Sequence, residues 1–146
     1  MKHIFTLPAR FAPKYLIFYP AAWLAWFSIL CWASSRARLP KTGIDIPHLD
    51  KVMHFSYFAA GAAVIAMGLL IFKNRYRPSL SKLSIFLICL IVGSATGVLD
   101  EYHQSFVEGR DGNDLGDMIA DTLGSIAGCL YIFWASAHEK RSQPAK

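Results

Sequence analysis

The chain has 146 residues, of which 54% are hydrophobic and only 17% are charged. A soluble domain needs a larger polar surface than this, so the composition predicts a membrane protein. The formal charge of +5 does not indicate nucleic-acid binding, because the basic residues flank apolar runs instead of forming one stripe with interleaved aromatic residues.

The first apolar run, at 15–33, follows a short basic segment at 1–14. Its length of about 19 residues exceeds the apolar part of a secretory signal, which has about 7–15, and is close to that of a membrane span. The run therefore predicts a retained transmembrane helix. Pro20 falls in the expected second turn, where a proline can bend a helix.

Three further apolar runs, at 52–72, 83–99 and 118–134, are each about long enough to cross a bilayer. Prolines and a glycine between the first two runs exclude one continuous helix there. A polar tail follows at 135–146. The sequence thus predicts an all-α membrane protein, with four transmembrane helices in a domain covering 15–134.

The basic residues also predict an orientation in the membrane. The N-terminus, the loop after the second run and the C-terminal tail hold ten of the 15 lysines and arginines. The positive-inside rule then places both termini in the cytoplasm, and the bacterial inner membrane is the expected location. The segments 50–54 and 100–117 are expected on the outer side.

Helical spacing brings polar and small residues onto shared faces, because residues three or four apart lie on one side of a helix. Such faces pack closely in membranes, so the polar ends are expected to converge in a cluster at one end of the bundle. Three series show this spacing: Gly93, Gly97, Asp100 and Gln104; Asp114, Asp117, Asp121, Gly124 and Gly128; and Asp50, His54 and Gly61.

Each of these residues also has a simpler structural interpretation. The glycine pairs are common in helix packing. Asp117 suits the first turn of a helix and Asp114 suits an N-cap, while His54 could be a hydrogen-bonded core histidine. Asp121 is harder to explain, because it lies about one turn inside an apolar run and there needs a partner, a metal ion or water. Cys31, Cys89 and Cys129 have no ligand-like spacing and are interpreted as small buried residues.

Three polar motifs follow one another along the chain: Asp50-Lys51-Val52-Met53-His54-Phe55, Asp100-Glu101-Tyr102-His103-Gln104 through Gly109-Arg110, and Asp117 through Asp121 to Gly124 and Gly128. This ordered set resembles the VanZ-like family of small bacterial membrane proteins. The resemblance covers about residues 50–134 and implies a four-helix membrane protein. The family takes its name from a member associated with low-level resistance to teicoplanin, which implies a candidate link to the cell envelope. The family pattern often has Asn where this chain has Asp121.

One hypothesis is an enzyme, either a hydrolase or a transferase, that acts on a phosphorylated envelope lipid. The candidate catalytic residues supply a general acid or base and an orienting carboxylate: His54, Glu101 and Asp117. The candidate substrate-binding residues are Lys51, Gln104 and Arg110, of which the two cations would hold phosphate. Structural or orienting roles are expected for Asp50, Asp100, Asp114 and Asp121.

The alternative hypothesis is a non-catalytic accessory protein that binds an envelope lipid, a glycopeptide or a partner protein. An ion pathway fits less well, because Asp121 is the single candidate relay residue inside the apolar runs. At the expected outer end, between Asp50 and Asp121, eight acidic residues face two basic ones. This excess favours a site that takes up a divalent cation, although no spacing is diagnostic of a particular metal.

Overall fold

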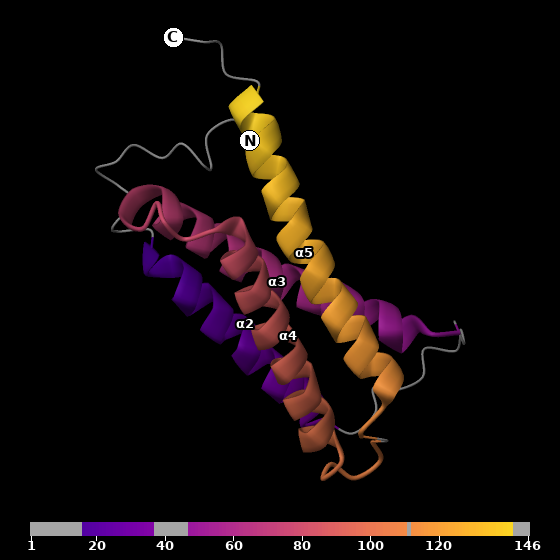
Figure 1. The fold of residues 1–146 in the computed structure, drawn as a ribbon. Helices are drawn as coiled ribbons and strands as arrows, with labels where there is room; N and C mark the ends of the chain where they lie inside the picture. Colours follow the sequence, from indigo (N-terminus) through magenta and orange to yellow (C-terminus); the bar gives the residue numbers. More distant parts are fainter. Residues whose placement is uncertain (1–15, 37–46, 111, 142–146) are drawn as a thin grey trace.

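The computed structural model describes residues 16–36, 47–110 and 112–141. They form four α-helices, shown in Figure 1: α2 (Phe18–Ser34), α3 (Leu49–Tyr76), α4 (Lys82–Gln104) and α5 (Leu115–Arg141). The prediction of an all-helical protein is confirmed for these residues. The predicted N-terminal segment 1–14 and the last residues of the tail lie outside them.

Three of the described helices, α3, α4 and α5, are long and apolar enough to cross a membrane. Each extends beyond the apolar run that predicted it, because polar residues at the ends continue the helix. In α4 the helix continues past the predicted end at residue 99 to Gln104. Asp100 and Gln104 therefore keep the helical spacing from Gly93 and Gly97.

Helix α2 is shorter, with 17 residues, and begins at Phe18. Pro20 thus lies in its first turn instead of the second, where the missing N–H interrupts no intrahelical hydrogen bond.

Helices α3 and α5 form the most extensive contact of the bundle, and α5 crosses α3 in Figure 1. Gly124 of α5 lies against the carbonyl oxygen of Phe55, and Gly128 lies against that of Ala59. A Cβ atom at either glycine would collide with the backbone of α3. The two glycines therefore let the helix backbones approach closely, as small residues do in membrane helices.

Helix α4 packs on α5 through the first predicted series. A Cβ atom on Gly93 would meet the side chain of Ser125, and one on Gly97 would meet the side chain of Asp121. Both contacts involve side chains on α5, so the small-residue face of α4 is directed at that helix. Gly97 leaves room for a carboxylate that could not otherwise lie between the two helices.

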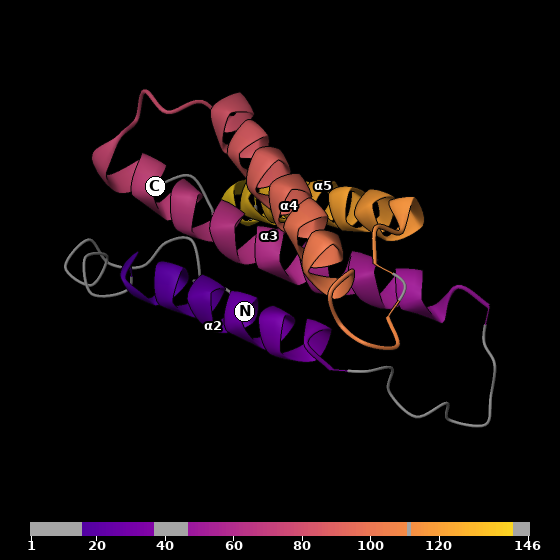
Figure 2. The ribbon, with the colours of Figure 1, turned by 90° about the horizontal axis from the view of Figure 1, so that it is seen from below.

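Helix α2 lies along α3, as Figure 2 shows. Two reciprocal hydrogen bonds join them: Trp26 Nε1 donates to the carbonyl of Tyr57 at 3.0 Å, and the Tyr57 hydroxyl donates to the carbonyl of Trp26 at 2.7 Å. The Trp26 ring fills the space beside Gly61 and packs edge-on against Phe58. Gly61 therefore faces α2, whereas His54 of the same predicted series contacts Asp121 of α5.

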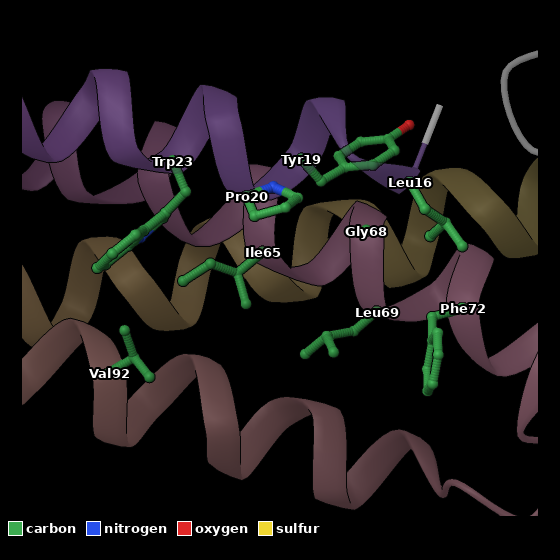
Figure 3. Close-up of a pocket in the computed structure, with 9 residues that line it drawn as sticks. All are labelled: Leu16, Tyr19, Pro20, Trp23, Ile65, Gly68, Leu69, Phe72 and Val92. Carbon is green, nitrogen blue, oxygen red and sulfur yellow. The ribbon is translucent and has the colours of Figure 1, made fainter. Parts of the chain in front are cut away.

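The apolar core lies among α3, α4 and α5, and includes the buried Cys89 and Cys129. Cys31 is exposed on α2, so the prediction that it is buried is wrong. Between α2, α3 and α4, Figure 3 shows an apolar pocket of about 570 Å³. Its lining residues are Leu16, Tyr19, Pro20, Trp23, Ile65, Gly68, Leu69, Phe72 and Val92.

Candidate functional site

The end of α2, the start of α3, the end of α4 and the start of α5 meet at one end of the bundle (Figure 1). Ser34 of α2 donates a hydrogen bond to Asp100 Oδ1 of α4. Lys51 of α3 contacts Asp117 of α5. These contacts join residues 66 positions apart in the sequence, and they bring polar side chains from four helices to the same end.

Lys51 is surrounded by carboxylates. Its Nζ lies 2.8 Å from Asp114 Oδ2, 2.8 Å from Asp117 Oδ1 and 3.3 Å from Asp50 Oδ2. Hydrogen bonding to this ammonium lowers the pKa of Asp114. The Asp50 side chain is 61% exposed, so its pairing with Lys51 contributes little. Lys51 is therefore bound mainly by the two aspartates at the start of α5.

Asp114 also supports the start of α5. Its Oδ1 accepts a hydrogen bond from the backbone N–H of Gly116 at 2.6 Å, and its carbonyl accepts one from Met118 at 3.1 Å. This is the contact of an N-cap, so the simpler interpretation of Asp114 holds beside its pairing with Lys51. Capping fixes the orientation in which α5 presents its acids.

His54 lies between two carboxylates of α5. Its Nδ1 is 3.0 Å from Asp121 Oδ1, which is hydrogen-bond distance, and its Nε2 is 3.9 Å from Asp117 Oδ2, which is not. Asp121 is 0% exposed. The carboxylate that the sequence left without a partner therefore has one in His54, and its second oxygen faces the space beside Gly97.

Glu101 is also 0% exposed and is held by one oxygen only. Its Oε2 accepts a hydrogen bond from the backbone N–H of Asp114 at 2.8 Å. Its Oε1 is buried without a hydrogen-bond partner in the described part of the chain, as is Asp121 Oδ2. A buried polar atom without a partner is costly, by about 1–3 kcal/mol and more for a charged group. These two oxygens therefore call for an explanation.

Asp100 and Gln104 form a separate group, in which both carboxylate oxygens of Asp100 accept a hydrogen bond. Gln104 Nε2 donates to Asp100 Oδ2 at 2.8 Å, and Ser34 Oγ donates to the other oxygen. Sequence reasoning missed Ser34, and also the pairing of Ser35 with His103 at 3.0 Å. The sequence feature that could have indicated these contacts is the pair Ser34 and Ser35 at the end of the first apolar run, next to Arg36.

Arg110 lies in the loop between α4 and α5 and is half-buried. Its Nε is buried without a hydrogen-bond partner, and no contact within 47–110 and 112–141 joins its guanidinium to the acids around Lys51. The structure therefore does not pair Arg110 with Lys51 as two arms of one site. It places Arg110 on the loop whose next described residues, Gly112 and Asn113, pack on the end of α4.

Among the residues that the structure describes, two sets of side chains have ligand atoms close enough to hold a metal ion. One ligand atom each from His54, Glu101 and Asp117 lie within 4.8 Å of one another, and the same is true of Asp50, Asp114 and Asp117. The second set surrounds the Lys51 ammonium. The arrangement as a whole can hold a cation and can accept or release protons at a histidine between carboxylates.

Neither a curated protein nor a solved structure is significantly similar to the chain. The sequence model of the VanZ/LLP1 family matches residues 5–136, which is most of the chain and contains every residue of the polar end described above. This agrees with the motifs around Lys51, Glu101 and Asp117. The chain therefore belongs to the VanZ/LLP1 family.

Proposed function

We propose that the polar end of the bundle binds the phosphorylated headgroup of an envelope lipid at the outer side of the bacterial inner membrane. In this proposal α2 is a fourth membrane span, with Leu24, Ile29 and Trp32 exposed to lipid. Both termini are cytoplasmic, because most basic residues lie on their side. The polar ends of the helices then lie at the depth of lipid headgroups.

The observation that carries the proposal is that the buried Nε of Arg110 has no hydrogen-bond partner in the described part of the chain. The Arg110 guanidinium has donors to spare, whereas Lys51 is already bound by carboxylates. Arginine binds phosphate through two parallel hydrogen bonds and is the usual choice for a partly buried phosphate site. Arg36 lies at the same end of the bundle and is exposed, with its guanidinium 4.5 Å from the centre of the Trp32 ring. The acidic residues around Lys51 and His54, called the acidic centre below, are Asp50, Glu101, Asp114, Asp117 and Asp121. This acidic centre thus has two arginines at its rim.

Replacing Arg110 by glutamine tests this binding. We expect Arg110→Gln to weaken binding of a polyprenyl phosphate tenfold or more, because a charged hydrogen bond contributes about 1.5–3 kcal/mol. The measurement is titration of the lipid into purified protein in neutral phosphatidylcholine nanodiscs. Arg77→Gln, at the opposite end of the bundle, is the matched control and should bind as the wild type does. Equal affinity of both variants would contradict the proposal.

The contact between His54 and Asp121 favours a second candidate function, hydrolysis of the lipid phosphate. A carboxylate on Nδ1 fixes the histidine tautomer and leaves Nε2 as a base when no metal ion is bound to it. Water would lose a proton to Nε2 and attack phosphorus, and the bond from phosphorus to the lipid oxygen would break. Nε2 would then give the proton to that oxygen, so that the lipid leaves as an alcohol. Transfer to another acceptor follows the same steps with a hydroxyl in place of water.

Release of inorganic phosphate separates this candidate from binding alone. If the protein is a hydrolase, His54→Gln should abolish phosphate release while lipid binding through Arg110 persists. Wild-type protein that binds the lipid and releases no phosphate, with or without divalent cations, would leave a non-catalytic accessory protein. Because the family resemblance implies a link to teicoplanin, susceptibility to this antibiotic is the phenotype to score in cells that carry each variant. A direct binding assay with the glycopeptide tests the same link on the purified protein.

A further inference from the structure

We propose that His54, Glu101 and Asp117 bind a divalent transition-metal ion, with Zn²⁺ the best fit. One ligand atom from each residue lies within 4.8 Å of the others, and the three come from three different helices. The inference rests on the proposed function and deepens it, because a bound cation would let this acidic centre hold the phosphate of a lipid.

The three residues share one pattern of hydrogen bonding. Each has one polar atom held by a neighbour and a second atom left over. His54 Nδ1 is held by Asp121, Glu101 Oε2 by the Asp114 N–H, and Asp117 Oδ1 by Lys51. The atoms left over are His54 Nε2, Glu101 Oε1 and Asp117 Oδ2. Orienting partners of this kind are typical of metal ligands, and a carboxylate on the far nitrogen of a ligating histidine is one of them.

The buried oxygen of Glu101 is the independent observation that points to a ligand. Glu101 is 0% exposed, and its Oε1 has no hydrogen-bond partner in the described part of the chain. Capping and helix packing do not account for it, because Oε2 already makes the bond to the start of α5. A cation beside Oε1 would satisfy the carboxylate and offset the negative charge of its acidic neighbours.

The distances suit a small ion with short bonds. His54 Nε2 and Asp117 Oδ2 are 3.9 Å apart, too far for a hydrogen bond. A tetrahedral Zn²⁺ with bonds of about 2.0–2.1 Å separates its ligands by roughly 3.3 Å, so a small inward movement would close the site. One imidazole with two carboxylates favours Zn²⁺ over Mg²⁺, which prefers oxygen ligands alone. Three protein ligands also leave a position for water or a phosphate oxygen.

The other acidic set does not compete for the ion. Asp50, Asp114 and Asp117 all contact Lys51 Nζ, at 3.3, 2.8 and 2.8 Å. The ammonium thus takes the place that a metal would need among these three residues. Asp117 belongs to both sets and uses a different oxygen in each, so it can link Lys51 to the metal.

Metal analysis of the full-length protein tests the inference. Purified protein in detergent, stripped with EDTA and dialysed against micromolar Zn²⁺, should retain one ion per chain by mass spectrometry. Glu101→Gln and His54→Gln should bind at least tenfold more weakly. Asp121→Ala, which removes the contact that orients His54, should weaken binding about 10–100-fold. Glu108→Gln and His138→Gln are the matched controls and should bind as the wild type does.

Titration of the wild type with Co²⁺ gives a readout that needs no variant. An intense visible absorption band, displaced by Zn²⁺ and not by Mg²⁺, supports the site even if Glu101→Gln fails to fold. Wild-type protein that retains no ion, or Glu101→Gln that binds Zn²⁺ normally, overturns the inference. Lipid binding measured in EDTA separates the two proposals: loss of metal without loss of lipid binding refutes the metal's role and leaves the lipid site standing.

Discussion

Lys51 shows how a single residue holds the polar end together. It links the start of α3 to Asp114 and Asp117 at the start of α5, and the Asp117 side chain is only 12% exposed. Removing the ammonium would leave a nearly buried carboxylate next to Asp121 and Glu101, with like charges on each side. A partly buried cation in this position stabilises more than an exposed ion pair does.

We therefore expect Lys51→Met to lower the free energy of unfolding by about 1.5–3 kcal/mol, the range for a hydrogen bond to a charged group. Asp50→Asn should change it by less than about 1 kcal/mol, because this side chain is exposed. The measurement is unfolding by SDS in mixed micelles, followed by circular dichroism. Similar values for the two variants would show that Lys51 contributes only a surface ion pair.

Individual residues also show where sequence reasoning reached its limit. Helical spacing correctly grouped Asp117 with Asp121, because both lie on one face of a regular helix. His54 and Gly61 also share a face of α3, but His54 contacts Asp121 of α5 whereas the Trp26 ring of α2 packs beside Gly61. Ser34 was missed because its partner, Asp100, is 66 positions away. Spacing within a helix predicts a shared face, but it does not predict which neighbour covers that face.

At the scale of the elements, the contact between α3 and α5 depends on two glycines. Gly124 and Gly128 face backbone carbonyls of α3, which cannot rotate away as a side chain can. The same contact places His54 beside Asp121 one turn earlier along α5. The spacing between these helices therefore sets both the packing and the geometry of the site.

We expect Gly124→Ala and Gly128→Ala each to destabilise the protein by about 1–3 kcal/mol, the usual effect of overpacking. The added methyl group would force the helix backbones apart. Thermal unfolding in detergent measures the change, and Ala95→Val, at an exposed position on α4, is the control. If α3 and α5 separate, metal or lipid binding should weaken as well in the glycine variants. Unchanged stability in both would mean that the helices do not pack as closely as described.

At the scale of the whole molecule, the two ends of the helix bundle differ in the charge of their side chains. One end gathers carboxylates, a histidine and Lys51, whereas the loop between α3 and α4 carries basic residues and Lys73 donates to the carbonyls of Pro78 and Leu80. The lipid-facing sides between them carry exposed Leu, Ile and Val side chains. The positive-inside rule uses the basic residues to assign an orientation, and it predicts that the polar end faces outward.

Labelling of single cysteines in intact cells tests that orientation. With the three native cysteines replaced by serine, Glu108→Cys should react with a membrane-impermeant maleimide added outside. Ser79→Cys, in the loop at the other end, should react only after the cells are permeabilised. Both positions are exposed, so access to the reagent is set by the membrane and not by burial. A tag at the N-terminus that is protected in intact cells would place α2 across the bilayer. The reverse labelling pattern would mean that the polar end faces the cytoplasm. The ligand would then have to come from inside the cell.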